Sequence, residues 1–467
     1  MVACLLALML GAACASPIPV ADLSIEGVTV VDVSSGLLPD RRVVIEDDRI
    51  VWVGPSASGG PLAARVIDGR GRFLMPGLWD AHVHFLYDPA LTEAMAALFL
   101  AHGVTSVRDT GGDLDRMLEL RDRFESGASP APRLFLSGPL LDGRHVVYDG
   151  ATAAQPKLGT RVASPEQARA RVRWLRSRGA DFIKIYELVD PEVFDALVDE
   201  ARRQGLPIAS HVPLSLTADV AGPRVDSMEH LRNIELACAS DWRARLETRR
   251  AKIAAFDGDR GFELRRSLHD SQRLPAIAAH DSRRCDEVIA SLRNTLQVPT
   301  LRLNAFNRSR PDRSPEWHAA LPSLPPSVER EFRRTALGLD DDPARADMRF
   351  ADWSRALVGR MVQAEVPIAA GTDTPIRLAI PGESLHRELE LLVESGLSNR
   401  QALAAATLAP ARFFALEEEL GRIAQGMRAD LVLLRANPLE DIRNTRTIEG
   451  VVSRGRWLGG AATGSPD

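Results

Sequence analysis

The sequence lacks the features that mark several classes of protein. Only four cysteines occur in 467 residues, too few for a small domain held together by disulfides. Lys and Arg total 58 against 63 Asp and Glu, so the net charge of −5 gives no basic excess for nucleic acid. Hydrophobic residues make up 45% of the chain, too much for a collagen-like or disordered protein. We therefore expect a globular protein with a large core and no nucleic-acid partner.

One long apolar run is present, and it lies at the N-terminus. Residues 2–13 are apolar and small, too short to span a bilayer comfortably, and lead into Ala13-Cys14-Ala15. This pattern predicts a signal peptide over residues 1–15 and an exported protein, periplasmic or secreted. Cleavage after Ala15 gives a soluble product, whereas lipidation at Cys14, the alternative, gives a membrane-anchored one. A disordered or buried apolar N-terminus is a further alternative.

Two of the remaining cysteines, Cys238 and Cys285, are candidates for a disulfide if the chain is exported. Buried free cysteines behave as small hydrophobic residues and are common in protein cores. We expect two free thiols here and keep the disulfide as the alternative.

Both ends of the chain have the texture of an antiparallel β-sheet. Short Val/Ile-rich runs are separated by turn residues at 23–33, 42–45, 50–54, 429–434 and 447–458. We expect residues 16–72 and 418–467 to form one small composite β-sandwich domain.

The middle of the chain alternates strand-like and helical stretches, which favours an α/β fold with parallel strands. Eight strand-like runs are present: the run leading into His82, then 103–108, 134–137, 180–185, 207–212, 227–230, 298–301 and 366–370. Eight such units predict a distorted (β/α)8 TIM barrel over residues 73–417 rather than an open sheet. Residues 240–295 are too long for an ordinary connection and predict a helical insertion over one mouth of the barrel.

One helix near the end can be predicted in more detail. Leu385, Leu389 and Leu392 follow helical spacing before Gly396 interrupts the pattern. Ser398 with Gln401 is the pattern of a capping box that begins the next helix.

His82 and His84 stand two residues apart on the first predicted barrel strand. That spacing places both imidazoles on one face of an extended chain, which in a barrel is the interior. Two imidazoles at the carboxyl end of a strand are a ready site for a divalent metal.

Other metal-ligating residue types follow in order at predicted strand ends: Lys184, His211, His230 and Asp373. A single histidine at a strand end is more often an ordinary polar residue than a ligand. Their common position at the carboxyl ends of barrel strands, where this fold gathers its chemistry, is what predicts a shared site.

With these motifs the chain resembles the amidohydrolase superfamily of metal-dependent hydrolases, within it the imidazolonepropionase-like and Xaa-Pro dipeptidase group. The resemblance covers nearly everything after the predicted signal peptide. It rests on residues 75–84, 103–109, 181–186, 381–386, 405–412 and 421–431.

The resemblance implies one or two divalent metal ions, with zinc as the expected element. In the binuclear type His82, His84 and Asp373 hold one ion, His211 and His230 hold the other, and Lys184 bridges both as an N-carboxylated lysine. An ammonium group would repel two dications, whereas a carbamate is anionic and has two oxygens to share. A mononuclear site with unmodified Lys184 is the alternative.

The implied reaction is hydrolysis of an amide C–N bond by metal-activated hydroxide. Asp373 is then the catalytic residue that carries a proton from the water to the leaving nitrogen. His145, Tyr148 and Tyr186 follow the third strand and Lys184, and are candidates to bind the substrate's carbonyl or carboxylate.

The favoured substrate is a small Xaa-Pro, other dipeptide or N-acyl amino acid. A cyclic amide or lactone is the alternative within enzymes. A catalytically silent barrel that acts as a binding protein is an alternative of another class, which six filled ligand positions disfavour. A homo-oligomer is left open.

Overall fold

The computed structural model describes residues 20–339 and 347–459. The predicted signal peptide over residues 1–15 and the predicted lipidation position Cys14 lie outside the described residues. Within the described part, no helix is both long enough and apolar enough to cross a membrane.

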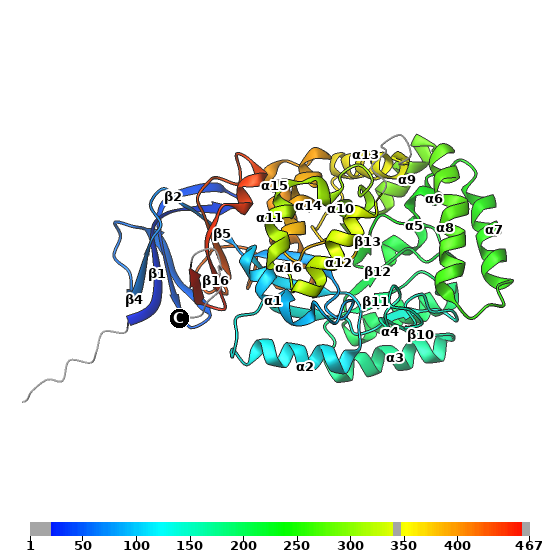
Figure 1. The fold of residues 1–467 in the computed structure, drawn as a ribbon, viewed down its shortest axis with the longest axis horizontal. Helices are drawn as coiled ribbons and strands as arrows, with labels where there is room; N and C mark the ends of the chain where they lie inside the picture. The colour runs from blue at the N-terminus through cyan, green and yellow to red at the C-terminus, as the bar shows by residue number, and fades with distance from the viewer. Residues whose placement is uncertain (1–19, 340–346, 460–467) are drawn as a thin grey trace, which may run out of the picture.

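Strands from both ends of the chain form one sheet, as the sequence predicts. Its order is β17-β16-β15-β5-β1-β2-β3, with β4 added beside β1. β5 joins the two halves, because it runs parallel to β1 and antiparallel to β15. Figure 1 shows the early strands and the late strands side by side at one end of the molecule. The bounds are β1 (Val20–Asp32), β2 (Gly36–Glu46), β3 (Arg49–Pro55), β4 (Leu62–Asp68), β5 (Phe73–Pro76), β15 (Leu431–Leu434), β16 (Ile448–Ser453) and β17 (Arg456–Gly459).

The middle of the chain holds two sheets of parallel strands. One has the order β6-β7-β8 and the other β10-β9-β11-β12-β13-β14, and every neighbouring pair is parallel. The bounds are β6 (Leu78–Val83), β7 (Val104–Asp109), β8 (Arg133–Leu136), β9 (Leu140–Asp142), β10 (Gly159–Arg161), β11 (Ile183–Ile185), β12 (Ile208–Ser210), β13 (Ser227–Glu229) and β14 (Leu296–Val298).

Two predicted strands need correction. The run predicted at 298–301 is strand only to Val298, because Thr300 adopts a left-handed φ of 45° and α10 begins at Leu301. The run predicted at 366–370 is not a regular strand and makes only an isolated bridge, Gln297 to Ile368. Pro367 within it has no N–H to donate to a ladder.

Backbone hydrogen bonds join the two parallel sheets on both sides. Asp181 N donates to Leu136 O at 2.9 Å, which connects the β11 segment to β8. Residues 367–370 lie between β14 and β6, since Gln297 N donates to Pro367 O at 2.8 Å and Ala81 N donates to Ala370 O at 2.9 Å. The carboxyl ends of these parallel segments therefore meet on the same side of the molecule.

Helices surround these strands, each burying an apolar face. α4 shows the local reason: Pro191 begins it, Val193, Leu197 and Ala201 are buried along one face, and Gly205 ends it in a left-handed conformation. The predicted helix around Leu385 is confirmed as α14, and the predicted capping box of Ser398 and Gln401 is present at α15. The bounds are α1 (Thr92–Ala101), α2 (Leu114–Glu125), α3 (Pro165–Arg178), α4 (Pro191–Gln204), α5 (Ala218–Ala221), α6 (Ile234–Ala237), α10 (Leu301–Asn304), α11 (Pro315–Ala320), α12 (Pro326–Leu337), α13 (Arg349–Gln363), α14 (Glu383–Glu394), α15 (Asn399–Ala405) and α16 (Leu408–Phe413).

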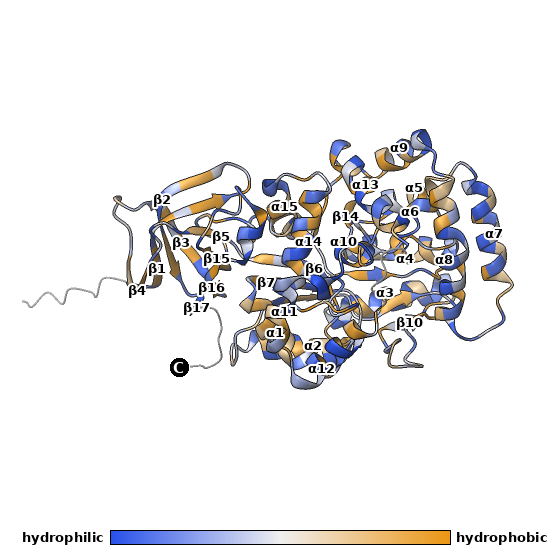
Figure 2. Cartoon of the chain, turned by 45° about the horizontal axis from the view of Figure 1, so that its top comes forward, coloured by the Kyte–Doolittle hydropathy of each residue, from blue (hydrophilic) through white to orange (hydrophobic). Residues whose placement is uncertain are grey.

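The long connection between β13 and β14 holds the short helix α6 and then three longer helices, α7 (Trp242–Ala254), α8 (Gly261–Ala278) and α9 (Ser282–Ser291). Figure 2 shows α7 at the outer edge, hydrophilic over much of its length. Cys238, at the end of α6, forms a disulfide with Cys285 of α9, which corrects the expectation of free thiols. The fold brings α6 and α9 side by side, as the hydrogen bond from Asp281 N to Cys238 O at 2.9 Å shows.

Candidate metal centre

Six predicted ligands line one small cavity at the carboxyl ends of the parallel strands: His82, His84, Lys184, His211, His230 and Asp373. Each is at most 5% exposed. Asp373 Oδ1 lies 3.4 Å from His82 Nε2 and 3.2 Å from His84 Nε2. The ring of His230 lies 4.4 Å from the His82 ring and 4.7 Å from the His211 ring. The structure therefore brings all six side chains together.

The strands explain this convergence. His82 and His84 stand at the end of β6, and Lys184 is the middle residue of β11. His211 and His230 each follow the last residue of a strand, β12 and β13. Asp373 is held beside His82 by its own N–H, which donates to His82 O at 2.8 Å. Asp373 and His230 also have left-handed φ values of 61° and 63°, strained conformations that cluster at functional sites.

Buried carboxylates set the orientation of two histidines. His82 Nδ1 lies 2.6 Å from Glu229 Oε2, and His211 Nδ1 lies 2.8 Å from Glu187 Oε1. Burial opposes ionisation of Glu229, but the charges of Arg108 and Lys184 and the hydrogen bond from His82 together lower the pKa of Glu229 well below its usual value. A carboxylate accepts hydrogen bonds only, so each Nδ1 carries the proton and each Nε2 presents a lone pair.

The third oriented ring is His230, whose Nδ1 lies 2.7 Å from Thr300 Oγ1. Asn304 Nδ2 also donates to His230 O at 2.7 Å. Both contacts come from the turn and helix that follow β14, so this segment fixes the backbone and the ring of His230.

Glu187 connects the metal-ligand cavity to the helical insertion. Arg265 Nε of α8 donates to Glu187 Oε1 at 3.1 Å, and His269 Nε2 lies 2.7 Å from Glu187 Oε2. Burial opposes ionisation of Glu187, but the charges of Arg265 and His269 lower its pKa well below the usual value. The insertion thus helps to hold His211 through Glu187.

Lys184 is the chemically unusual member of the cluster. It is fully buried, and in the described part of the chain its Nζ has no hydrogen-bond partner. Burial lowers the pKa of Lys184 to about 7, so a neutral amine is available near neutral pH. The sequence has only two other lysines, Lys157 and Lys252, and arginine at nearly every other basic position. Arginine does not lose its proton in this way and does not form a carbamate.

The protonation states suit a divalent cation. Burial lowers the pKa of His82 to about 4 and that of His211 to about 3, so both imidazoles are neutral ligands near neutral pH. Burial alone would raise the pKa of Asp373, but the hydrogen bond from His84 and the neighbouring imidazoles of His82 and His84 lower it to about 2. Neutral imidazole nitrogens, a carboxylate and an unpartnered buried amine together fit a metal centre.

The predicted substrate residues fall in two places. Tyr148 and Tyr186 line the metal-ligand cavity, and the Tyr186 ring lies 4.4 Å from the His211 ring. His145 is not among the described residues that line this cavity. Its ring packs 5.0 Å from Phe256, because the insertion covers that side of the loop.

Sequence reasoning missed the residues that orient the ligands. Glu229 and Glu187 stand beside predicted ligands in the chain, one residue before His230 and three after Lys184. Buried acidic residues next to strand-end histidines are the signal that could have identified them. Thr300, Arg265 and His269 carry no such signal, because tertiary folding alone brings them to the site.

The chain belongs to the Amidohydrolase family, which it matches over residues 73–257 and 324–458. The imidazolonepropionase of Streptomyces coelicolor is 24% identical over 86% of this chain and 87% of that protein. The imidazolonepropionase of Micrococcus luteus is 28% identical over 50% of this chain, and the match spans about half the length of that relative, 53%. A solved Xaa-Pro dipeptidase with bound methionine covers 94% of this chain and 100% of its own, with TM-score 0.65 and 21% identity. That likeness confirms a mixed α/β fold of the amidohydrolase type.

Proposed function

We propose that this protein is a metal-dependent hydrolase that cleaves an amide C–N bond of a small molecule. The observation that carries the proposal is the single buried cavity lined by four histidines, Lys184 and Asp373. We also propose that the parallel segments close into a distorted (β/α)8 barrel, with the mixed sheet of the two chain ends as a separate small domain. The hydrogen bonds on both sides of β6-β7-β8 support that closure.

The proposed ligand assignment follows the distances. His82, His84 and Asp373 offer one ligand atom each, all within 4.8 Å of one another, and would hold one ion. His211 and His230 would hold a second, with Lys184 as an N-carboxylated lysine between the two. Zinc is the proposed element, since it accepts imidazole and carboxylate ligands. When bound, two such ions activate a water molecule and polarise a substrate carbonyl.

The protein's own groups supply the rest of the reaction. Asp373 is deprotonated near neutral pH and stands against both His82 and His84, where it accepts the proton of the attacking water. It then delivers that proton to the leaving nitrogen, which is a poor leaving group until it is protonated. Tyr148 and Tyr186, on the wall of the same cavity, are placed to bind the substrate's oxygen atoms.

Two substrate classes follow from different observations. A pocket beside the metal centre that is rich in arginine favours a dipeptide, such as Xaa-Pro, or an N-acyl amino acid with a free carboxylate. The imidazolonepropionase relative that aligns over most of both chains favours a cyclic amide. With either substrate class, we propose that the substrate is a small molecule and that the protein acts after export, which the sequence of residues 1–15 predicts.

The test couples metal analysis to a substrate screen. Zinc-loaded protein is assayed against Xaa-Pro and other dipeptides, N-acyl amino acids, hydantoins and lactones, before and after chelation. We expect bound divalent metal and hydrolysis that chelation abolishes and added metal restores. A protein that folds tightly, holds no metal and hydrolyses none of these compounds would instead be the silent binding protein, and the proposal would be wrong.

A further inference from the structure

A second pocket adjoins the metal-ligand cavity. Its volume is about 340 Å³, within the range of pockets that hold small ligands. Arg232 lines both cavities, so the two are neighbours with a shared wall. Asn304, which lines the second pocket, donates to the backbone oxygen of His230. A substrate with its scissile bond at the metal centre can therefore extend into this second pocket, hereafter the arginine pocket.

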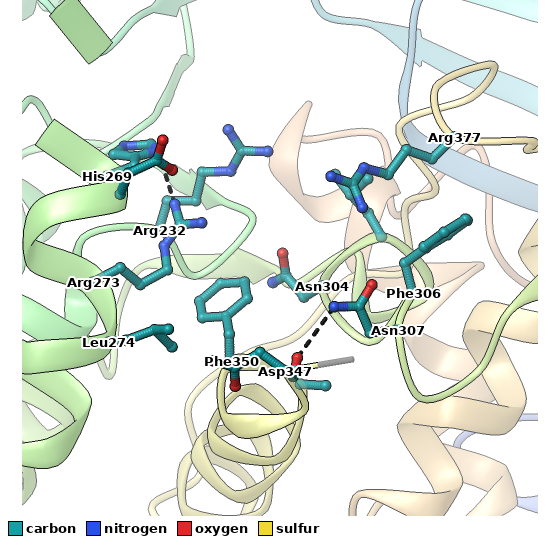
Figure 3. Close-up of a pocket in the computed structure, with 13 residues that line it drawn as sticks. Arg232, His269, Arg273, Leu274, Asn304, Phe306, Asn307, Asp347, Phe350 and Arg377 are labelled. Carbon is teal, nitrogen blue, oxygen red and sulfur yellow. Dashed lines mark hydrogen bonds between the residues drawn. The ribbon is translucent and has the colours of Figure 1, made fainter. Parts of the chain in front are cut away.

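The arginine pocket carries surplus positive charge. Arg232, Arg273 and Arg377 line it, and Figure 3 shows Arg232 on the left and Arg377 on the right among the lining residues. Its two acidic residues are engaged elsewhere: Asp270 lies 3.5 Å from Arg266 and Asp347 accepts from Arg349 at 2.6 Å.

The three arginines differ in their partners. Arg273 lies 3.5 Å from Glu235, and Arg232 lies 3.5 Å from Glu187. Among the described residues Arg377 is within ion-pair distance of no carboxylate. Arg377 is exposed to solvent in the pocket, and a solvent-accessible guanidinium without an anion can take a ligand carboxylate as a bidentate partner.

The backbone that carries Arg377 is the one that carries Asp373. Arg302, which is 4% exposed, donates to the backbone oxygens of Thr372, Ile376 and Arg377 at 2.8 to 2.9 Å. Arg377 itself has a left-handed φ of 52°. Arg302 thus fixes the spacing between the catalytic carboxylate and the free guanidinium, so binding at one is geometrically coupled to reaction at the other.

Two aromatic rings complete the arginine pocket. Phe306 lies under the Arg377 guanidinium at 5.2 Å, and Phe350 lies under that of Arg273 at 4.5 Å. Leu274 and Leu303 also line the pocket. The lining therefore pairs cationic groups with apolar surface, which suits a carboxylate attached to an apolar or aromatic group.

We propose that the arginine pocket selects substrates in which a free carboxylate, bound by Arg377 with Arg232 in the same lining, is joined to an apolar or aromatic group that packs on Phe306 and Phe350. This inference rests on the proposed hydrolytic function and specifies its substrate: an N-acyl or aminoacyl derivative of an apolar amino acid. Arg377 is a specificity-determining residue in this arrangement.

The first test measures binding without any hydrolysis. Isothermal titration of the zinc-loaded protein compares 3-phenylpropionate with 3-phenylpropanol, which lacks the charge. Wild type is compared with Arg377→Gln, Arg377→Lys and the control Arg176→Gln, an exposed arginine of α3. We expect Arg377→Gln to weaken carboxylate binding about 10- to 100-fold. We expect Arg377→Lys to restore part of the affinity and Arg176→Gln to bind as wild type does.

The second test measures selectivity with N-acetylphenylalanine and its carboxamide. We expect wild type to favour the acid, and Arg377→Gln to raise KM for the acid far more than for the carboxamide. Equal effects on both compounds, or phenylpropionate binding that does not change in Arg377→Gln with an unaltered melting temperature, would overturn the proposal. Hydrolysis could persist in that case, so failure of the arginine pocket is distinguishable from failure of the hydrolase. Carboxylate binding lost in Arg377→Gln, with no hydrolysis of any compound, would support the pocket and count against the hydrolase.

Discussion

Glu229 offers a sharp test of how the ligands are held, through the isosteric change Glu229→Gln. Glu229 is fully buried and accepts from Arg108 Nη2 at 2.7 Å, from Ser227 Oγ at 2.8 Å and, on its other oxygen, from His82 Nδ1 at 2.6 Å. In glutamine one of these oxygens becomes an NH2 group, which only donates. If NH2 faces His82, it needs a lone pair on Nδ1, so the proton moves to Nε2 and the metal-facing nitrogen loses its lone pair. If NH2 faces Arg108, two donors meet in a buried site.

The magnitude follows from those two outcomes. Loss of the partner that orients a ligand histidine weakens metal binding about 10- to 100-fold. Arg108 is 1% exposed and would lose its only carboxylate partner among the described residues, which typically costs about 3 to 5 kcal/mol of unfolding free energy. We expect the lower end, because Arg108 keeps its bond to Ala81 O at 2.6 Å and its contact with the Phe413 ring at 4.6 Å.

The assay is competition for zinc against a chelator of known affinity, with thermal unfolding measured on the same samples. The matched control is Glu192→Gln, an exposed glutamate of α4 that should change neither quantity. Zinc affinity of Glu229→Gln within about twofold of wild type, at an unchanged melting temperature, would refute the argument that Glu229 fixes the proton of His82.

Three further predictions address the same site and the insertion. Asp373→Asn should lower kcat about 100- to 10,000-fold, and metal analysis of that variant should show whether metal is lost as well; activity near wild type would remove Asp373 from the mechanism. Zinc at about a thousand times its Kd should stabilise the metal-free protein by about 4 kcal/mol in thermal unfolding, and a melting temperature independent of zinc would contradict a metal centre in the folded state. Cys285→Ser opens the Cys238–Cys285 disulfide, which spans 47 residues, and should lower the unfolding free energy by about 2 to 4 kcal/mol; an unchanged stability under non-reducing conditions would show that the disulfide does not constrain the insertion.

The convergence of the six proposed ligands could be predicted from the sequence, because the end of a strand can be recognised from the local pattern of residues. His82 and His84 stand two residues apart at the end of β6, so both face the same side, and His211 and His230 directly follow short apolar runs that predict β12 and β13. The residues that hold the proposed ligands in place could not be predicted, and the reason is physical. Arg265 and His269 reach Glu187 from the insertion, about 80 residues along the chain, and no local pattern encodes that contact.

The errors have similar causes. The run at 366–370 has the composition of a strand. In the structure it lies between β14 and β6, but it contains Pro367 and forms a single isolated bridge. The pairing of Cys238 with Cys285 depends on how the insertion folds back, which spacing along the chain does not reveal. The substrate-binding role of His145 stays a prediction; in the structure Phe256 of the insertion packs against its ring.

The central claim is that Lys184 and five other side chains hold two divalent ions, and one measurement tests it directly. Protein prepared with ¹³C-labelled bicarbonate and zinc is analysed for metal content and by ¹³C NMR, where three lysines are the only side chains that can contribute a carbamate signal. The account predicts about two zinc ions per chain and one carbamate resonance that is absent from Lys184→Ala and retained in Lys157→Ala. Wild-type protein that holds two zinc ions without a carbamate, or a carbamate signal that survives in Lys184→Ala, would contradict it.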